Sequence, residues 1–296
     1  MNRGNWQPIA YLFIAPAVIL FSVFVMIPVF VSFYWGLTQY DVLHPSVWVG
    51  LENYRRLLSA DPRFWKAFRN TLLYVIGVVP TGISISVLLA VALEELDRGK
   101  QFFKVLFFIP SVTSVVAISV VWKWLFAGEK FGLINYALIK LGLQPIDWLL
   151  SPTWTLPAII IMSVWAGLGY NVVLFSAGLS TIPSTLYEAA KMDGAGWWDR
   201  FWHVTLPMLR PTLVFVVAMS MIASFQVFDQ VYIMTGGTGE GVGGVLDSAL
   251  TLVAYLYDQG FQQFHMGYAS AIAYVIFACV LGLTLFNIRL LRTRAD

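Results

Sequence analysis

Residues 188–204 read EAAKMDGAGWWDRFWHV, a block unlike the rest of a strongly apolar chain. Its seventeen residues include three acidic side chains, two basic ones, a histidine and three tryptophans, and apolar segments lie before and after it. Charged side chains are costly inside a bilayer, so a block of this composition marks a place where the chain leaves the lipid. The fold around it follows from the rest of the sequence.

The composition is that of a membrane protein. Of 296 residues, 59% are hydrophobic and 11% are charged, whereas soluble globular domains have roughly 45–50% and about 25%. The net charge of +2 comes without a dense basic run, which argues against a nucleic-acid partner. The single cysteine, Cys279, excludes an intrachain disulfide and a cysteine metal site. The three histidines are far apart in the sequence, so no metal site is predicted.

Six segments are long and apolar enough to cross a bilayer, which takes about 20 residues in a helix that satisfies its own backbone. They run over about 11–36, 70–93, 105–126, 156–178, 207–234 and 267–291. The first is too long for a signal-peptide core and has no small-residue cleavage site after it, so we expect it to be retained. The sequence therefore predicts an all-α polytopic membrane protein with six transmembrane helices, forming a single domain over residues 1–296.

Six spans place both termini on one side of the membrane. Lys and Arg divide ten to eight between the two sides, which is too even to decide the orientation. The ends of the chain differ more, because residues 235–264 contain no Lys or Arg whereas the eight residues after Ile288 contain three. The termini and the block at 188–204 are therefore expected in the cytoplasm.

The sequence shows no energy source for transport. A P-loop needs Gly-Lys followed by Ser or Thr, but Gly99-Lys100 is followed by Gln101. The glycine-rich run at 235–244 fits a flexible connector. Asp229 is the best candidate for ion coupling within the bilayer. Three classes remain: a transporter powered by another polypeptide, an ion-coupled secondary transporter that depends on Asp229, and a membrane enzyme, which the absence of a catalytic constellation disfavours.

The block predicts two short helices within a loop over 183–207. Thr185 and Glu188 have the spacing of a capping box, so a first helix is expected to begin here and to run through Met192. Gly194 and Gly196 are expected to end it. A second helix follows, with an apolar side of Trp197, Trp198, Phe201 and Trp202 and a water-facing side of Asp199, Arg200 and His203. Such helices suit either a membrane interface or a groove in a partner protein.

Polar residues within the spans predict a substrate path. The residues expected to bind substrate are Gln226, Asp229 and Gln230 in the fifth span and Tyr170 and Asn171 in the fourth. The first three are spaced to share one stripe of a helix, and the other two lie near the middle of the membrane, where an aromatic ring can stack on a substrate. The alternative for the fourth span is helix packing, because Ser163, Gly167 and Asn171 recur every four residues.

The residue order in the block resembles the EAA motif of inner-membrane permease subunits of binding-protein-dependent ABC importers. The motif residues are Glu188-Ala189-Ala190, Gly194, Val204 and Leu206-Pro207, with valine where the family usually has isoleucine. Four further stretches are similar to the carbohydrate-uptake branch: GLENYRRLL at 50–58, NTLLYV at 70–75, FFIPSVTSVVAISVVWKWLF at 107–126 and MGYASAIA at 266–273. The likeness covers nearly the whole chain and is strongest to the subunit type that pairs with a second, different permease. It departs at Gly236-Gly237-Thr238, where the family usually has Gly-Gly-Pro.

The resemblance implies a type I ABC importer permease fold in a bacterial or archaeal cytoplasmic (inner) membrane, in a subunit that is not itself an enzyme. The loop at 183–207 would contain the coupling helix, held in a cleft of an ATPase subunit. Glu188 would pair with a basic group there, and local capping is its alternative role. The residues expected to couple to the ATPase are Glu188, Ala189, Ala190, Asp193, Gly194, Leu206 and Pro207.

The implied partners are a second permease subunit in a heterodimer, two ATPase subunits, an extracytoplasmic sugar-binding protein and membrane lipid. ATP and Mg²⁺ would be bound by the ATPase subunits, so no cofactor is expected in this chain. Closure of the ATPases would move the loop at 183–207 and tip the helices between inward-open and outward-open states. The expected substrate is a sugar or related polyol of the oligosaccharide, disaccharide, glycoside or glycerol-phosphate class.

Overall fold

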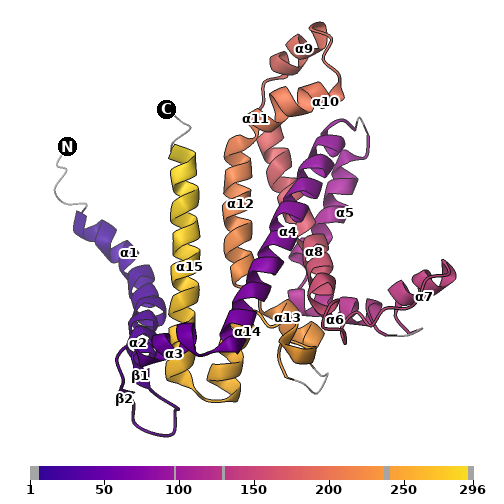
Figure 1. The fold of residues 1–296 in the computed structure, drawn as a ribbon. Coiled ribbons are helices and arrows are strands. Elements are labelled where there is room, and N and C mark those ends of the chain that lie inside the picture. The colour runs from indigo at the N-terminus through magenta and orange to yellow at the C-terminus, as the bar shows by residue number, and fades with distance from the viewer. Residues whose placement is uncertain (1–6, 97, 129–130, 237–240, 293–296) are drawn as a thin grey trace. The chain divides into compact units, whose positions relative to one another are not determined.

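Helices dominate the structure, a computed structural model that describes residues 7–96, 98–128, 131–236 and 241–292 (Figure 1). Within these residues, four helices are long and apolar enough to cross a membrane: Ala10–Gly36, Pro62–Glu94, Thr155–Leu179 and Met266–Asn287. Two pairs of helices also qualify but are bent, Lys100–Val112 with Val115–Leu125 by 97° and Trp197–Met208 with Arg210–Phe225 by 69°. Counting each bent pair as one span gives six, in agreement with the expected all-α class.

The first of two compact units consists of Met1–Asp61 and Leu256–Val275. Its elements are α1 (Gln7–Phe21), a π-helical turn (Ser22–Met26), α2 (Ile27–Gly36), the antiparallel pair β1 (Thr38–Gln39) and β2 (Val47–Trp48), α3 (Glu52–Ser59), a π-helical turn (Asp258–Gln262) and the start of α15 (Met266–Arg292). The side-chain amide of Asn53 donates to the carbonyl oxygens of Gly36 and Thr38 at 3.0 and 2.9 Å. A Cβ on Gly267 would lie 2.1 Å from the Thr38 carbonyl oxygen, so α15 begins tightly against β1.

The second unit consists of Pro62–Tyr255 and the residues from Ile276 onward. Its elements are α4 (Pro62–Glu94), α5 (Lys100–Val112), α6 (Val115–Leu125), α7 (Leu133–Lys140), α8 (Thr155–Leu179), α9 (Ser184–Met192), α10 (Trp197–Arg200), a π-helical turn (Phe201–Thr205), α11 (Leu206–Met208), α12 (Arg210–Phe225), α13 (Asp229–Thr235), a 3₁₀ turn (Val245–Asp247), most of α14 (Leu252–Tyr257) and the end of α15. Within it, α8 packs against α4 and α5, and α12 packs against α4.

The core of the second unit lies between α4, α8 and α12. Val79, Ile83 and Val87 recur every four residues, which places them on one side of α4. They pack with the buried Val172 and Phe175 of α8. Between lipid-embedded helices the gain comes from close van der Waals packing rather than from removal of water, so the fit of these surfaces decides how tightly the helices associate.

The backbones of α5 and α8 approach most closely at Gly169. A Cβ on this residue would lie 2.0 Å from the carbonyl oxygen of Phe107 and 2.7 Å from the Cα of Phe108. Small residues allow such contacts in membranes. At Gly167, two residues earlier on α8, a Cβ would meet no atom of the other described helices within 4 Å. The two glycines therefore have different structural roles.

The third expected span, 105–126, is broken in the middle. Thr113 and Ser114 separate α5 from α6 and have extended conformations, with ψ of 144° and 127°. Pro110, near the end of α5, has no N–H to donate to the helix. The hydroxyl of Thr113 donates to the carbonyl oxygen of Ile109 at 2.9 Å and so satisfies a carbonyl near the end of the helix. The break leaves two half-helices that meet at an angle.

The expectation of one continuous helix over 207–234 is wrong. Phe228 separates α12 from α13, with φ −140° and ψ −60°. The hydroxyl of Thr251 donates to the carbonyl oxygen of Val227 at 3.1 Å, and both residues are buried. In a continuous helix this carbonyl would accept the N–H four residues further on. A side chain 24 positions away in the sequence thus takes the bond that would extend α12.

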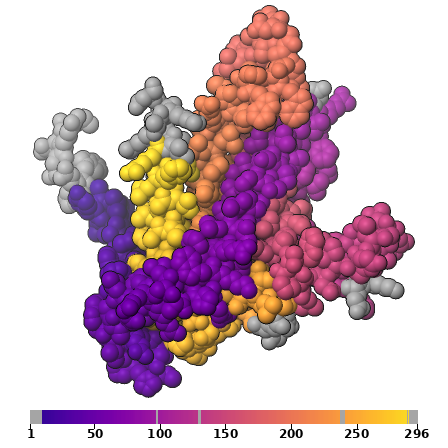
Figure 2. All heavy atoms as spheres, in the orientation of Figure 1, coloured from indigo at the N-terminus to yellow at the C-terminus, as the bar shows by residue number. Residues whose placement is uncertain are grey.

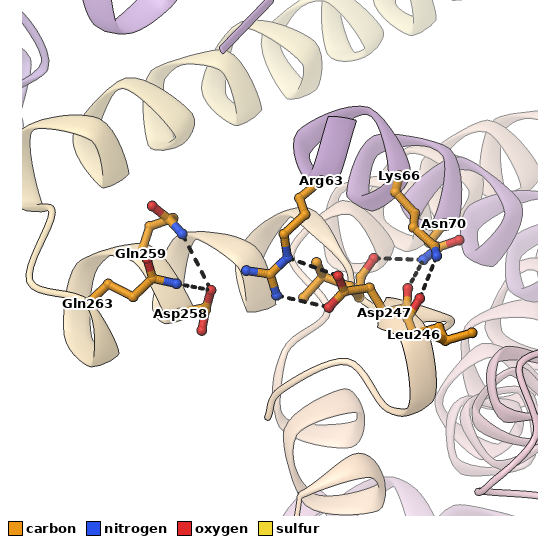
Figure 3. A network of polar contacts seen from close by, with 9 residues as sticks. Arg63, Lys66, Asn70, Leu246, Asp247, Asp258, Gln259 and Gln263 are labelled. Atoms are coloured by element: carbon orange, nitrogen blue, oxygen red, sulfur yellow. Dashed lines mark hydrogen bonds and ion pairs between the residues drawn. The ribbon is translucent and has the colours of Figure 1, made fainter. Parts of the chain in front are cut away.

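Side chains of α4 hold the loop that precedes α14 (Figure 3). The guanidinium of Arg63 donates two hydrogen bonds of 2.9 Å to the carboxylate of Asp247. The amide of Asn70, which is buried, donates to the carbonyl oxygens of Asp247 and Leu250 at 2.9 and 3.0 Å. Asp247 has a φ of 55°, a conformation that costs free energy in residues other than glycine. These contacts stabilise the loop in that conformation.

Candidate functional site

The loop expected at 183–207 forms two helical segments separated by a glycine turn. At the end of α9, the N–H of Ala195 donates to the Ala190 carbonyl at 2.9 Å and that of Gly194 to the Lys191 carbonyl at 3.1 Å. This pair of bonds is a Schellman motif, which needs a left-handed residue just past the helix. Gly194 has a φ of 79° and supplies it. The glycine turn predicted from the sequence is therefore present.

The capping box expected between Thr185 and Glu188 does not form. Pro183 occupies the N-cap of α9, and no side chain in the described part of the chain caps the helix. Glu188 is then the fifth residue of the helix, beyond the third position that a capping box requires. Pro183 also has no N–H that a glutamate could accept. The alternative interpretation, in which Glu188 acts as a local helix cap, is therefore wrong.

The second helical segment is capped by its own acid. The carboxylate of Asp199 accepts the N–H of Gly196 at 3.2 Å, at the start of α10. The helix continues through the π-helical turn Phe201–Thr205 into α11. The expected second helix is present, and its start is fixed by Asp199 rather than by a Ser or Thr.

The aromatic residues of this segment do not share one face. The rings of Trp197 and Phe201 stack with centroids 5.6 Å apart, and Phe201 is buried against the core of the second unit. Trp198 and Trp202 are exposed by 60% and 57%. One aromatic pair therefore anchors the loop to its own subunit, and the other remains available to lipid or to a partner.

A polar contact joins the two segments of the loop to each other. The hydroxyls of Tyr187 on α9 and Thr205 after α10 are hydrogen-bonded at 3.0 Å and link the two segments. Arg200 was expected to face water, but it is half-buried and lines a cleft of about 280 Å³ together with Glu94 and Glu95. The Tyr187–Thr205 hydrogen bond joins the two segments of the loop, and the stacked Trp197 and Phe201 rings pack the loop against the core of the second unit.

The expected ATPase-coupling residues divide into two groups in the structure. Glu188, Ala189, Asp193 and Gly194 are exposed, Ala190 is half-buried, and Leu206 and Pro207 are half-buried at the start of α11. Among the described residues, none forms a hydrogen bond or ion pair with the carboxylates of Glu188 and Asp193. Figure 2 shows α9 and α10 as a knob at one end of the second unit. The knob thus presents an acidic and apolar surface, with Met192 84% exposed beside it.

A second candidate site is a cavity of about 490 Å³ within the second unit. It is lined by residues of α4, α5, α6, α8, α12 and α13 and includes the break between α5 and α6. Gly167 in its wall is the central residue of the 25-residue helix α8, so the cavity lies at mid-span. Its polar lining includes Ser163, Tyr170, Asn171, Ser220, Ser224 and Gln230.

Three of the five expected substrate-binding residues line this cavity, and two do not. Tyr170, Asn171 and Gln230 are in its wall. Gln226 is exposed at the C-cap of α12, and Asp229 is exposed at the start of α13. The stripe expected for the fifth span required an unbroken helix, and the break at 226–228 removes that geometry.

The cavity residues missed by sequence reasoning include two serines of α12. Ser220 and Ser224 lie four residues apart on α12, so both face the cavity from one side of that helix. The signal was available, because two hydroxyl groups at helical spacing in an apolar span are the kind of pattern that marks a polar path. Ser163, which the sequence also allowed as a packing residue, lines the cavity as well.

Comparisons with known proteins agree with this architecture. The model of the family "Binding-protein-dependent transport system inner membrane component" matches residues 82–292. The lactose transport system permease protein LacF of Rhizobium radiobacter is 37% identical over 292 residues, covering 96% of this chain and 94% of that protein. The arabinooligosaccharides transport system permease protein AraP of Bacillus subtilis (strain 168) is 35% identical, covering 95% and 87%.

A solved structure shows the same fold. A chain of a bacterial ABC transporter involved in the import of the acidic polysaccharide alginate superposes with a TM-score of 0.84 at 22% identity, covering 97% of this chain and 96% of that one. The family model and these relatives define a multi-pass transport permease, and its fold is the type I ABC importer permease fold. The chain belongs to the binding-protein-dependent transport system inner membrane component family. The resemblance seen in the sequence is thereby confirmed.

Proposed function

We propose that this chain is one permease subunit of an ATP-driven importer of neutral sugars, moved by an ATPase that docks on the α9–α10 knob. The observation that carries the proposal is the mid-span cavity with hydroxyl, amide and phenol groups in its wall. Broken spans that meet at a polar cavity are typical of transporter binding sites. Relatives described as permeases for lactose, for arabinooligosaccharides and for trehalose/maltose support the sugar class.

The cavity lining favours an uncharged sugar over a phosphorylated one. Its volume of about 490 Å³ lies in the range of about 300–1,000 Å³ usual for small-molecule sites. Among the described residues in its wall, none carries a formal charge. Serine hydroxyls and the side-chain amides of Asn171 and Gln230 can both donate to and accept from sugar hydroxyls, and the ring of Tyr170 offers a stacking surface. The glycerol-phosphate class therefore becomes less favoured.

The knob suits a partner that supplies the energy. Its exposed carboxylates and apolar side chains match the pattern of a helix seated in a protein groove, with Glu188 facing a basic group of the partner. The full assembly would contain this subunit, a second and different permease, two ATPase subunits that bind ATP and Mg²⁺, and an extracytoplasmic sugar-binding protein. Both termini and the knob would lie in the cytoplasm, where closure of the ATPases moves the loop.

Reconstitution separates this function from ion-coupled transport. Proteoliposomes with the complete complex should take up lactose, maltose or an arabinooligosaccharide only when ATP, the ATPase subunits and the loaded binding protein are all supplied. A proton or sodium gradient alone should drive no uptake, and Asp229→Asn should retain the ATP-dependent rate because Asp229 lies outside the cavity. Uptake that is driven by an ion gradient without nucleotide and lost in Asp229→Asn would instead establish a secondary carrier.

A further inference from the structure

The hydroxyl of Ser111 bridges one turn of α8. Ser111 lies in the last turn of α5, and its Oγ donates to the carbonyl oxygen of Ala166 at 3.2 Å. The same Oγ accepts the N–H of Tyr170 at 2.9 Å. Ala166 and Tyr170 are four residues apart, so they are the acceptor and donor of one α-helical turn. A side chain from another helix thus bonds to both backbone groups of that turn.

The bridged turn is one of the parts of α8 that line the cavity. Ala166, Gly167, Tyr170 and Asn171 all line the cavity, and so does Ser111. A side chain inserted at the hydrogen-bond ladder is one of the few causes of local bending in a helix. Two glycines, at 167 and 169, make the same turn weaker in intrinsic helix propensity. The orientation of the Tyr170 and Asn171 side chains therefore depends on the contacts that fix the backbone of this turn.

We propose that Ser111 is a positioning residue: its bridge sets the backbone of α8 at Ala166–Tyr170 and so aims Tyr170 and Asn171 at the substrate. Ser111 already donates its hydroxyl hydrogen to the carbonyl oxygen of Ala166. The residue therefore acts through the backbone of α8 and does not donate a hydrogen bond to the sugar. The role for substrate rests on the proposed function, whereas the geometric role does not. Ser111 is only half-buried and lines the cavity, so threonine is the conservative replacement that keeps its hydroxyl.

Three substitutions isolate the bridge. Ser111→Ala removes both hydrogen bonds, and Ser111→Thr keeps the hydroxyl. The matched control is Ser119→Ala on α6, a buried serine whose hydroxyl donates to the Val115 carbonyl of its own helix at 2.7 Å and to no other described residue. All three variants are made in a chain with Cys279→Ser and Asn171→Cys, so that one cysteine reports on the bridged turn.

The first measurement is the rate at which the cysteine at position 171 reacts with a small water-soluble methanethiosulfonate reagent in the assembled transporter in nanodiscs. Ser111→Ala should change this rate by about threefold or more, as expected for loss of an interhelical hydrogen bond. Ser111→Thr and Ser119→Ala should leave it within about twofold of the parent, because neither removes the bridge. Equal rates in Ser111→Ala and the parent overturn the proposal, and so does a Ser111→Thr rate that follows Ser111→Ala.

The second measurement is sugar uptake per ATP hydrolysed, with residue 171 left as asparagine. Ser111→Ala should lower this ratio by about threefold and Ser111→Thr should restore it. An altered labelling rate with an unaltered ratio would overturn the role for substrate. If the proposed function is wrong, the result is different, because the unmodified transporter would then take up no sugar. The labelling experiment would still decide whether Ser111 positions α8.

Discussion

Gly169→Ala is expected to be the most disruptive single substitution in the second unit. Its Cβ would lie 2.0 Å from the carbonyl oxygen of Phe107, and this neighbour is backbone that no rotamer change can move away. Relief requires α5 and α8 to separate, and overpacking of this kind typically costs about 1–3 kcal/mol and occasionally more. We expect about 3 kcal/mol or more, because the clash involves main chain on both helices. Thermal unfolding of the purified subunit in detergent measures the loss.

The matched control is Gly167→Ala, two residues away on the same helix. Apart from the adjoining backbone of α8, none of the described residues has an atom within 4 Å of the Cβ that it would introduce. It should leave stability unchanged or raise it by up to about 1 kcal/mol, since alanine is the better helix former. Similar melting temperatures for the two variants would show that α5 and α8 do not pack as described.

Glu188→Ala is expected to uncouple the subunit from its ATPase without weakening the subunit itself. The carboxylate is exposed and caps no helix, so its removal costs the isolated chain nothing specific. Breaking a buried ion pair from one side costs about 3–5 kcal/mol, whereas loss of a cap costs about 0.5–2 kcal/mol. Docking on the ATPase should therefore weaken by on the order of a hundredfold or more, and sugar-stimulated ATP hydrolysis should fall to the basal rate.

Thr185→Ala separates coupling from capping. Thr185 is exposed on the same helix, and no described side chain caps α9. This variant should match the unmodified protein in both melting temperature and stimulated hydrolysis. If Glu188→Ala lowered the melting temperature and left stimulated hydrolysis normal, the residue would be a local structural element and the docking role would fail.

The fold was largely predictable because a bilayer demands long apolar helices, but the breaks in those helices were not. The helix expected over 207–234 fails at Val227, whose carbonyl bonds to Thr251, and no local pattern indicates that contact. The turn at Gly194 was predictable because a Schellman motif is local. The capping box was misassigned for a local reason, since Pro183 and not a hydroxyl residue holds the N-cap.

In the candidate sites, too, local sequence patterns were predictable and contacts between distant segments were not. Tyr170 and Asn171 were found because polar residues in an apolar span are conspicuous, and both line the cavity. Asp229 had the same signal, but the broken fifth span places it elsewhere. The Ser111 bridge depends on two helices far apart in the sequence and could only be seen in the structure.

The central claim, that energy enters this subunit through the α9–α10 knob, is tested most directly by cross-linking. Met192→Cys places a thiol at a residue that is 84% exposed on the knob, and Leu141→Cys places one at a 75% exposed residue after α7, each with Cys279→Ser. In the complete transporter, a short bifunctional reagent on residue 192 should capture the nucleotide-hydrolysing subunit, and the same reagent on residue 141 should not. Failure of residue 192 to capture that subunit, in a complex that still imports sugar at the expense of ATP, would contradict the account.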